Sequence, residues 1–220
     1  MQKKLIVFDL DGTLYKLRGG SYNKSPLKKK VLVNAQNFVA LKLSKNKTEA
    51  KNIINLIQKK YGEQISIGLE KEFGINRYDY FNTVWDIPAK GIVRRTKNLR
   101  GLLLSLKKEC RLVIVSDAPL VWIKNVLKEL GIEDIFQGMV FSGEGDRRKE
   151  FDNIFYYISK TLKISPLDCI VIGDQEDTDV IPAKKLCMKT VFIHSKLQSR
   201  EADLSIKSIQ SLLTKIKKLL

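Results

Sequence analysis

The sequence is poor in the residues that build disulfide frameworks and membrane spans. Its 220 residues include three cysteines, Cys110, Cys169 and Cys187, whose spacing matches no metal-ligand pattern. Because each cysteine has apolar neighbours, we expect three buried free thiols in a reducing cytoplasm. Uninterrupted apolar runs such as "LIVF" and "LVIV" are much shorter than the roughly 20 residues of a membrane-spanning helix. These shortages argue against a disulfide-stapled fold and a membrane span, and they predict a cytoplasmic protein with no membrane partner.

Histidine is also scarce, and acidic residues are outnumbered by basic ones. The single histidine, His194, follows an apolar run, where a surface or loop position is expected more than a catalytic one. Lys and Arg number 40 against 24 Asp and Glu, which gives a formal net charge of +16. Such a positive field attracts anions, either phosphorylated metabolites or nucleic acid. The lysines are scattered along the chain, which favours a solvated surface, so nucleic acid is not an expected partner.

Short apolar runs alternate with segments of helical period over most of the chain. The runs show no polar alternation, which is typical of strands covered on both faces of a parallel sheet. The expected strands are 4–8, 111–115, 138–141, 169–172 and 190–193. The expected helices between them are 99–109, 119–131, 149–163 and 179–187. This alternation predicts a doubly wound, Rossmann-like α/β fold with a parallel sheet.

Residues 16–91 interrupt this alternation with a stretch that contains no convincing strand. Helical patterns occupy 25–43, 48–62 and 63–74, with Ser25 and Pro26 at the first start. We therefore predict an α/β core made of residues 1–15 and 92–220, and an inserted, all-helical cap domain of residues 16–91. Because the insert leaves the end of the first strand, it is expected to cover the carboxyl edge of the sheet, where ligands bind in such folds.

The insert and the C-terminal tail also carry aromatic and amphipathic patterns. The aromatic residues of the insert could stack on a nucleobase, but packing within the insert or against the core is favoured. They are Tyr61, Tyr78, Tyr80, Phe81 and Trp85. Trp122, in the helix after the second strand, is also assigned to packing. The tail 206–220 is amphipathic, and docking on the sheet is favoured over binding to a membrane surface.

Polar residues follow the expected strands at the points where the strands end. Asp9 and Asp11 end the first strand, Ser116 and Asp117 the second, and Asp174 the fourth. The carboxyl ends of neighbouring parallel strands lie at one edge, so these side chains are expected to meet. Two carboxylates that leave an extended chain on the same side require a cation or a shared proton. Mg²⁺ prefers such oxygen ligands, so the sequence predicts a magnesium site here.

Four segments resemble the four motifs of the haloacid dehalogenase-like hydrolase superfamily. They are "FDLDGTL", "VIVSDA", the lysine before "FDNIF", and "VIGDQEDTDV", and they occur in the family's order. The resemblance covers about residues 1–15 and 92–195, and the insert is similar to the family's cap between the first two motifs. The chain also resembles the phosphoglycolate phosphatase and pyrimidine 5'-nucleotidase branch. This resemblance implies a phosphoric monoester hydrolase with a Mg²⁺ cofactor.

The resemblance assigns a catalytic role to four residues. Asp9 matches the nucleophile that forms an aspartyl-phosphate, and Asp11 matches the acid/base that serves the leaving alcohol and the water. Members that cleave carbon–halogen bonds lack an acid at the position of Asp11, so its presence favours phosphoryl transfer. Ser116 matches the hydroxyl that binds the phosphoryl group. Lys149 matches the lysine that neutralises the phosphoryl oxygens and the nucleophile.

The resemblance also assigns the remaining ligands of phosphate and metal. Asp117, beside Ser116, is placed at the phosphate site. Asp174 matches the Mg²⁺ ligand of the fourth motif, together with Asp9 and the backbone carbonyl of Asp11. Asp179 matches the second acid of that motif, which supports the metal site, and Asp177 is a competing carboxylate. The chain departs from the family at Glu150, where many relatives have proline, and at Cys187, where relatives often have glycine.

The function predicted from these residues is a Mg²⁺-dependent phosphatase for a small phosphorylated metabolite, such as a nucleoside monophosphate or phosphoglycolate. A phosphomutase of the β-phosphoglucomutase kind shares the motifs and remains an alternative. A basic nucleic-acid-binding protein, or a phosphatase of polynucleotide ends, is a further alternative. The expected assembly is a monomer or a homodimer.

Overall fold

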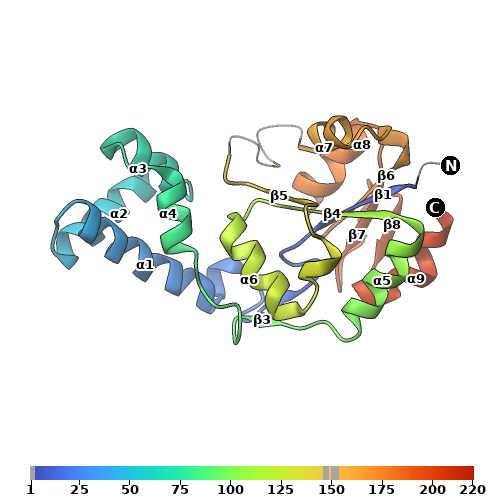
Figure 1. Ribbon diagram of the computed structural model, residues 1–220, viewed down its shortest axis with the longest axis horizontal. Coiled ribbons are helices and arrows are strands. Elements are labelled where there is room, and N and C mark those ends of the chain that lie inside the picture. Colours follow the sequence, from blue (N-terminus) through green and yellow to red (C-terminus); the bar gives the residue numbers. More distant parts are fainter. Residues whose placement is uncertain (1–2, 146–148, 150–153) are drawn as a thin grey trace.

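A six-stranded parallel sheet forms the centre of the protein in this computed structural model, which describes residues 3–145, 149 and 154–220 (Figure 1). The strands are β1 (Leu5–Asp9), β4 (Arg111–Ser116), β5 (Val140–Ser142), β6 (Cys169–Gly173), β7 (Lys189–Ile193) and β8 (Leu204–Ile206). Their order in the sheet is β5-β4-β1-β6-β7-β8. The first strand of the chain is therefore central, with a buried neighbour on each side.

Helices cover both faces of this sheet because successive side chains of each strand point to opposite sides. On one face, Ile6 and Phe8 of β1 pack with α5 (Leu99–Glu109), α6 (Leu120–Leu130) and α9 (Leu212–Lys215). On the other face, Leu5 and Val7 pack with α7 (Ile154–Leu162) and α8 (Ile181–Lys185). The predicted doubly wound α/β fold is confirmed.

In chain order, four α-helices of the described residues lie between β1 and β4. They form a lobe beside the sheet (Figure 1). They are α1 (Pro26–Lys42), α2 (Lys47–Tyr61), α3 (Ile65–Phe73) and α4 (Arg77–Val84). A short antiparallel ladder of β2 (Lys16–Leu17) and β3 (Val93–Arg94) joins the two ends of this segment. The division into a core of 1–15 and 92–220 and a cap of 16–91 stays a prediction.

Local sequence explains where the inserted helices begin and end. The Ser25 hydroxyl accepts the N–H of Lys28, and Pro26 occupies the first helical turn of α1. Asn46 and Glu49 form a reciprocal capping box at the start of α2. Gly74 ends α3 in the left-handed conformation. Helix α4 was not expected, because its sequence RYDYFNTV has no clear apolar period.

The ends of the chain add two features to the sheet. The edge strand β8 was not expected, because it is only three residues long and Ser205 interrupts its apolar residues. The tail that follows it buries Ile209, Leu212 and Ile216 against the core, as predicted. No helix in the described residues is long and apolar enough to cross a membrane.

The expectation of three buried thiols is wrong for one cysteine. Cys110 and Cys169 are buried, but Cys187 is exposed. It lies in the turn after α8, where its N–H donates to the carbonyl of Lys184 over 2.8 Å and its φ is +61°. An apolar neighbourhood in the sequence did not bury this side chain, because the turn directs it outward.

Candidate active site

The register of the three central strands brings the predicted polar residues to one edge. In this parallel arrangement Asp9 pairs with Val115, one residue before Ser116, and Phe8 pairs with Ile172, two residues before Asp174. The strand ends are therefore level, and the side chains that follow them share one side of the sheet. The local reason is that each polar residue comes directly after a buried apolar run.

Lys149 lies at the centre of the buried charges. Its ammonium donates to Asp9 Oδ1 and to Asp179 Oδ1, both over 2.6 Å, and all three side chains are at most 5% exposed. Burial by itself would lower the pKa of Lys149, but the carboxylates of Asp179 and Asp9 outweigh it and hold that pKa above its usual range. Burial raises the pKa of Asp179 to about 6, against the opposing pull of Lys149. Lys149 is therefore charged and is held against the expected nucleophile.

Asp174 completes a group of three acids that fits a metal ion. One ligand oxygen from each of Asp9, Asp174 and Asp179 lies within 4.8 Å of the others. Asp9 Oδ2 and Asp174 Oδ1 are buried and have no hydrogen-bond partner among the described residues. Burial, and then the charge of Asp9, raise the pKa of Asp174 to about 7, and the ammonium of Lys16, 3.7 Å from Asp174 Oδ2, offsets this only in part. Because these are hard oxygen ligands, the residues present fit Mg²⁺.

Two glycines make room for these acids. A Cβ at Gly12, whose φ is +95°, would lie 2.0 Å from Asp174 Oδ2. A Cβ at Gly173 would lie 2.1 Å from Asp179 Oδ2. Any side chain at either position would displace a carboxylate of the group.

Asp11 is held by three donors. The Ser116 hydroxyl donates to Asp11 Oδ2 over 2.9 Å, the Trp122 indole N–H lies 3.4 Å from Oδ1, and the Tyr15 hydroxyl also donates to Oδ1. Burial, and then the nearby charge of Asp9, raise the pKa of Asp11, whereas the three hydrogen bonds lower it. A carboxyl group with a raised pKa suits an acid/base role.

Tyr15 and Trp122 are contacts of Asp11 that sequence reasoning did not assign. Trp122 was assigned to packing, and it is fully buried, yet its indole N–H faces Asp11. Tyr15 lies four residues after Asp11, and a turn between them brings the two residues together in an isolated β-bridge. The position of Trp122 could not be inferred, because it depends on how α6 packs over β1.

Ser116 and Asp117 lie at the end of β4, as expected. Ser116 is buried, and its oxygen also accepts the N–H of Ala118 over 3.1 Å. The Asp117 carboxylate accepts the backbone N–H of Lys149 over 2.9 Å, so it positions the lysine. Its expected place at the substrate phosphate stays a prediction.

Asp177 and Asp179 differ in burial, which favours Asp179 as the second acid of the fourth motif. Asp177 is exposed, whereas Asp179 is buried and also accepts the N–H of Gln175 over 3.1 Å. Glu150, where the chain departs from the family pattern, lies outside the described residues.

Residues 3–186 match the family described as "haloacid dehalogenase-like hydrolase". The chain belongs to this family. The match spans the central strands and every site residue described above. The resemblance inferred from the four motifs is therefore confirmed.

Several relatives of this chain are named phosphatases. The chain is 27% identical over 84 residues to N-acylneuraminate-9-phosphatase from Homo sapiens, a match that spans 38% of this chain and only 34% of that relative. It is 27% identical over 98% of both chains to glyceraldehyde 3-phosphate phosphatase from Methanocaldococcus jannaschii. Among solved structures, a HAD phosphatase from Thermococcus onnurineus has a TM-score of 0.65 at 22% identity and covers 96% of each chain, which supports the fold.

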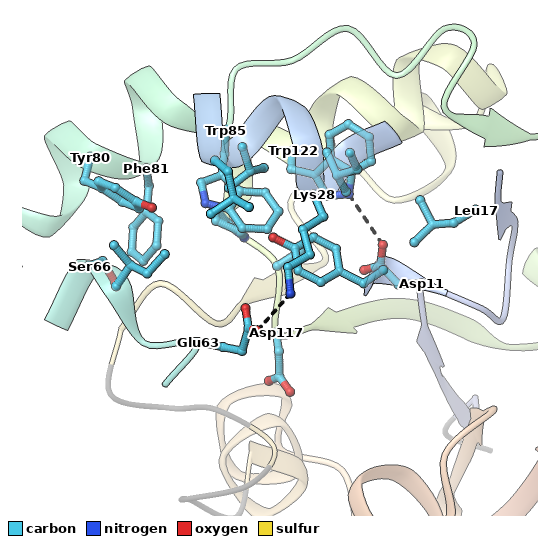
Figure 2. Close-up of a pocket in the computed structure, with 17 residues that line it drawn as sticks. Asp11, Leu17, Lys28, Glu63, Ser66, Tyr80, Phe81, Trp85, Asp117 and Trp122 are labelled. Carbon is cyan, nitrogen blue, oxygen red and sulfur yellow. Dashed lines mark hydrogen bonds and ion pairs between the residues drawn. The ribbon is translucent and has the colours of Figure 1, made fainter. Parts of the chain in front are cut away.

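A cavity of about 260 Å³ adjoins Asp11 in this haloacid dehalogenase-like hydrolase. Figure 2 shows Trp122 joined to Asp11 on one side of the cavity and Lys28 joined to Glu63 on the other. The rings of Tyr22 and Trp85 stack with centroids 6.0 Å apart, and both residues line the cavity. The cavity is built from both regions of the chain, the inserted helices and the ends of β1 and β4.

Proposed function

We propose that the protein is a Mg²⁺-dependent phosphatase that hydrolyses a small phosphorylated metabolite through an aspartyl-phosphate on Asp9. The observation that carries this proposal is the state of Asp9. One of its oxygens is bound by Lys149 over 2.6 Å, and the other is buried without a partner among the described residues. A buried carboxylate of this kind is unfavourable unless a cation or an electrophile uses it. The named phosphatases among its relatives support the same activity.

In the first half-reaction, a carboxylate oxygen of Asp9 forms a bond to phosphorus while the bond from phosphorus to the ester oxygen breaks. Asp11 gives its proton to the departing alkoxide, which leaves as an alcohol. Lys149 neutralises charge on Asp9 and on the phosphoryl oxygens. The Ser116 hydroxyl, which donates to Asp11 over 2.9 Å, moves its hydrogen bond to a phosphoryl oxygen.

In the second half-reaction, a water molecule attacks the phosphorus of the acyl phosphate. Asp11, now ionised, takes the proton of that water, and the carboxylate of Asp9 leaves. Inorganic phosphate is released, and Asp11 is again protonated for the next cycle. The two-step route replaces one difficult displacement with two easier ones.

Asp9, Asp174 and the backbone carbonyl of Asp11 would hold the Mg²⁺ ion, with Asp179 beside them. Bound there, the ion would neutralise the negative charge of the transferring phosphoryl group. Gly12 leaves the space that Asp174 occupies, because a Cβ at this glycine would overlap Asp174.

The proposal is tested by phosphate release from 4-nitrophenyl phosphate with Mg²⁺ and with a chelator. We expect activity only with the metal, and we expect Asp9→Asn to lower kcat by at least about 10³-fold. Asp177→Asn is the matched control, because it changes an exposed carboxylate of the fourth motif and should leave kcat unchanged. Acid quenching during turnover should trap a phosphoenzyme that is labile to hydroxylamine. Activity that survives Asp9→Asn or ignores the chelator would contradict the mechanism.

A further inference from the structure

The cavity beside Asp11 is lined mainly by large apolar side chains. Leu27 and Val31 of α1, Ile65 of α3 and Phe81 of α4 face it from the insert, and Trp122 faces it from α6. The leaving group of a substrate whose ester oxygen lies at Asp11, and which extends from there toward the insert, would occupy this cavity. A two-carbon acid would leave most of the 260 Å³ without a partner, whereas an apolar body of ring size would occupy more of it and pack against its lining.

The polar groups of the cavity disfavour a second negative charge. Among the described residues that line it, Lys28 is the cation, and Asp11, Glu63 and Asp117 are acids. The ammonium of Lys28 is already engaged: it lies 3.1 Å from Glu63 Oε1 and 2.6 Å from Asn23 Oδ1, and it stands over the ring of Tyr22. Because Asp11 is protonated when the substrate binds, a carboxylate on the leaving group would meet a compensated lysine and the carboxylates of Glu63 and Asp117.

We propose, on the basis of the phosphatase function above, that the substrate is a phosphate monoester whose leaving group is uncharged and carries an apolar body of ring size. The phosphoryl group lies at Asp9, and the body lies between Trp122 and the insert helices. Lys28 and Glu63 bind each other at the side of the cavity away from Asp11 (Figure 2), so they exclude a carboxylate there. Small acidic esters such as 2-phosphoglycolate are then poor substrates.

Three alkyl phosphates separate size from charge, because their leaving alcohols have similar basicity. They are benzyl phosphate, ethyl phosphate and 4-carboxybenzyl phosphate. We expect kcat/KM for benzyl phosphate to exceed that for ethyl phosphate by about 10- to 100-fold, the range given by burial of one aromatic ring. We expect the added carboxylate to lower kcat/KM by at least about tenfold.

Binding can be measured without turnover, because the chain has two tryptophans and both line the cavity. In Asp9→Asn, benzyl phosphate should change the intrinsic tryptophan fluorescence at lower concentration than ethyl phosphate or 2-phosphoglycolate. If Asp9→Asn binds the three esters in this order but the wild type hydrolyses none of them, the selectivity of the cavity would be supported and the phosphatase proposal would be overturned. Hydrolysis or binding of 2-phosphoglycolate or ethyl phosphate equal to that of benzyl phosphate would overturn the inference and leave the phosphatase proposal standing.

Glu63→Gln gives a sharper test, because it frees the ammonium of Lys28 while 65% of the Glu63 side chain is already exposed. We expect the preference for benzyl over 4-carboxybenzyl phosphate to fall by about fivefold, the size of one exposed ion pair. Asp79→Asn is the matched control: it frees Lys42 from an exposed pair, with an N···O distance of 3.0 Å, on residues that do not line the cavity. An equal change of preference in both variants would mean that Glu63 acts only through net charge, and would contradict its role in the cavity.

Discussion

The buried site of the α/β core and the surface of the inserted helices use charged residues in opposite ways. In the core, Lys149 is 4% exposed and binds two carboxylates that are no more than 5% exposed. In the insert, the pair of Lys42 and Asp79 joins α1 to α4 with side chains that are 44% and 57% exposed. Exposed pairs contribute at most about 1 kcal/mol, whereas a buried charge must have a partner or be neutralised. Charge buried at the site is therefore tied to chemistry. Exposed pairs, which the core also has in Arg100 and Asp134, are largely tied to solvation.

The largest expected effect follows from removal of the buried cation. Lys149→Met leaves the buried carboxylates of Asp9 and Asp179 without a cation between them. In the presence of a chelator, this should lower the free energy of unfolding by about 3–5 kcal/mol. Activity should fall by at least about 10³-fold, because the nucleophile loses its partner. Urea unfolding and phosphate release measure the two effects.

The double variant Lys149→Met/Asp179→Asn serves as the control for Lys149→Met. It removes one of the two opposed charges, so stability should recover in part while activity stays lost. Recovery of activity together with stability would mean that Lys149 serves folding alone, and the contrast between core and insert would fail.

The next effect concerns the space for Asp174. Gly12→Ala introduces a Cβ that overlaps Asp174, so we expect Mg²⁺-dependent activity to fall by about 100-fold. Gly20→Ala is the control, because Gly20 has a similar φ of +85° and nothing within 4 Å of its Cβ position. Both variants carry the same backbone strain, and only the first should raise the Mg²⁺ concentration needed for half-maximal activity. Equal losses would assign the effect to strain.

A smaller effect is expected in the packing of the insert. A Cβ at Gly68 would lie 2.6 Å from Ile57 Cγ2 and 2.7 Å from Tyr61 Cδ2, between α3 and α2. Gly68→Ala should cost about 1–3 kcal/mol through overpacking. Because these residues do not touch Asp9, KM should rise while the yield of trapped phosphoenzyme at saturating substrate is kept. A selective fall in that yield would show that the insert acts on the chemistry itself.

The smallest effect concerns Cys187. Its φ of +61° lies in the left-handed region, which favours glycine. Cys187→Gly should raise the unfolding free energy by up to about 1 kcal/mol, since the strain it relieves is partly offset by the greater freedom of glycine in the unfolded chain. Cys187→Ala keeps the Cβ and should show no gain in the same urea titration. A gain in both variants would assign the effect to the thiol.

Prediction from sequence was most successful where one local property determines the structure. The strand expected at 4–8 is β1 (Leu5–Asp9), because a continuous apolar run is stable only between two covering layers. The helix expected at 119–131 is α6, bounded by Pro119 and Gly131. Prediction failed for α4 and β8, where the apolar pattern is weak. It also failed for Cys187, because the direction in which the turn points the side chain cannot be read from its neighbours in the sequence.

The sequence by itself determined five of the six strands of the described sheet, most of the helices, the family, and the polar residues that follow the strands, from Asp9 to Asp174. These follow from apolar periodicity and from motifs that are local in the chain. Only the tertiary structure decided that Lys149 binds Asp9 and Asp179 together, that Trp122 faces Asp11, and that Glu63 compensates Lys28. Such contacts join residues up to 140 positions apart. They depend on how the helices pack over the sheet, which local patterns do not specify.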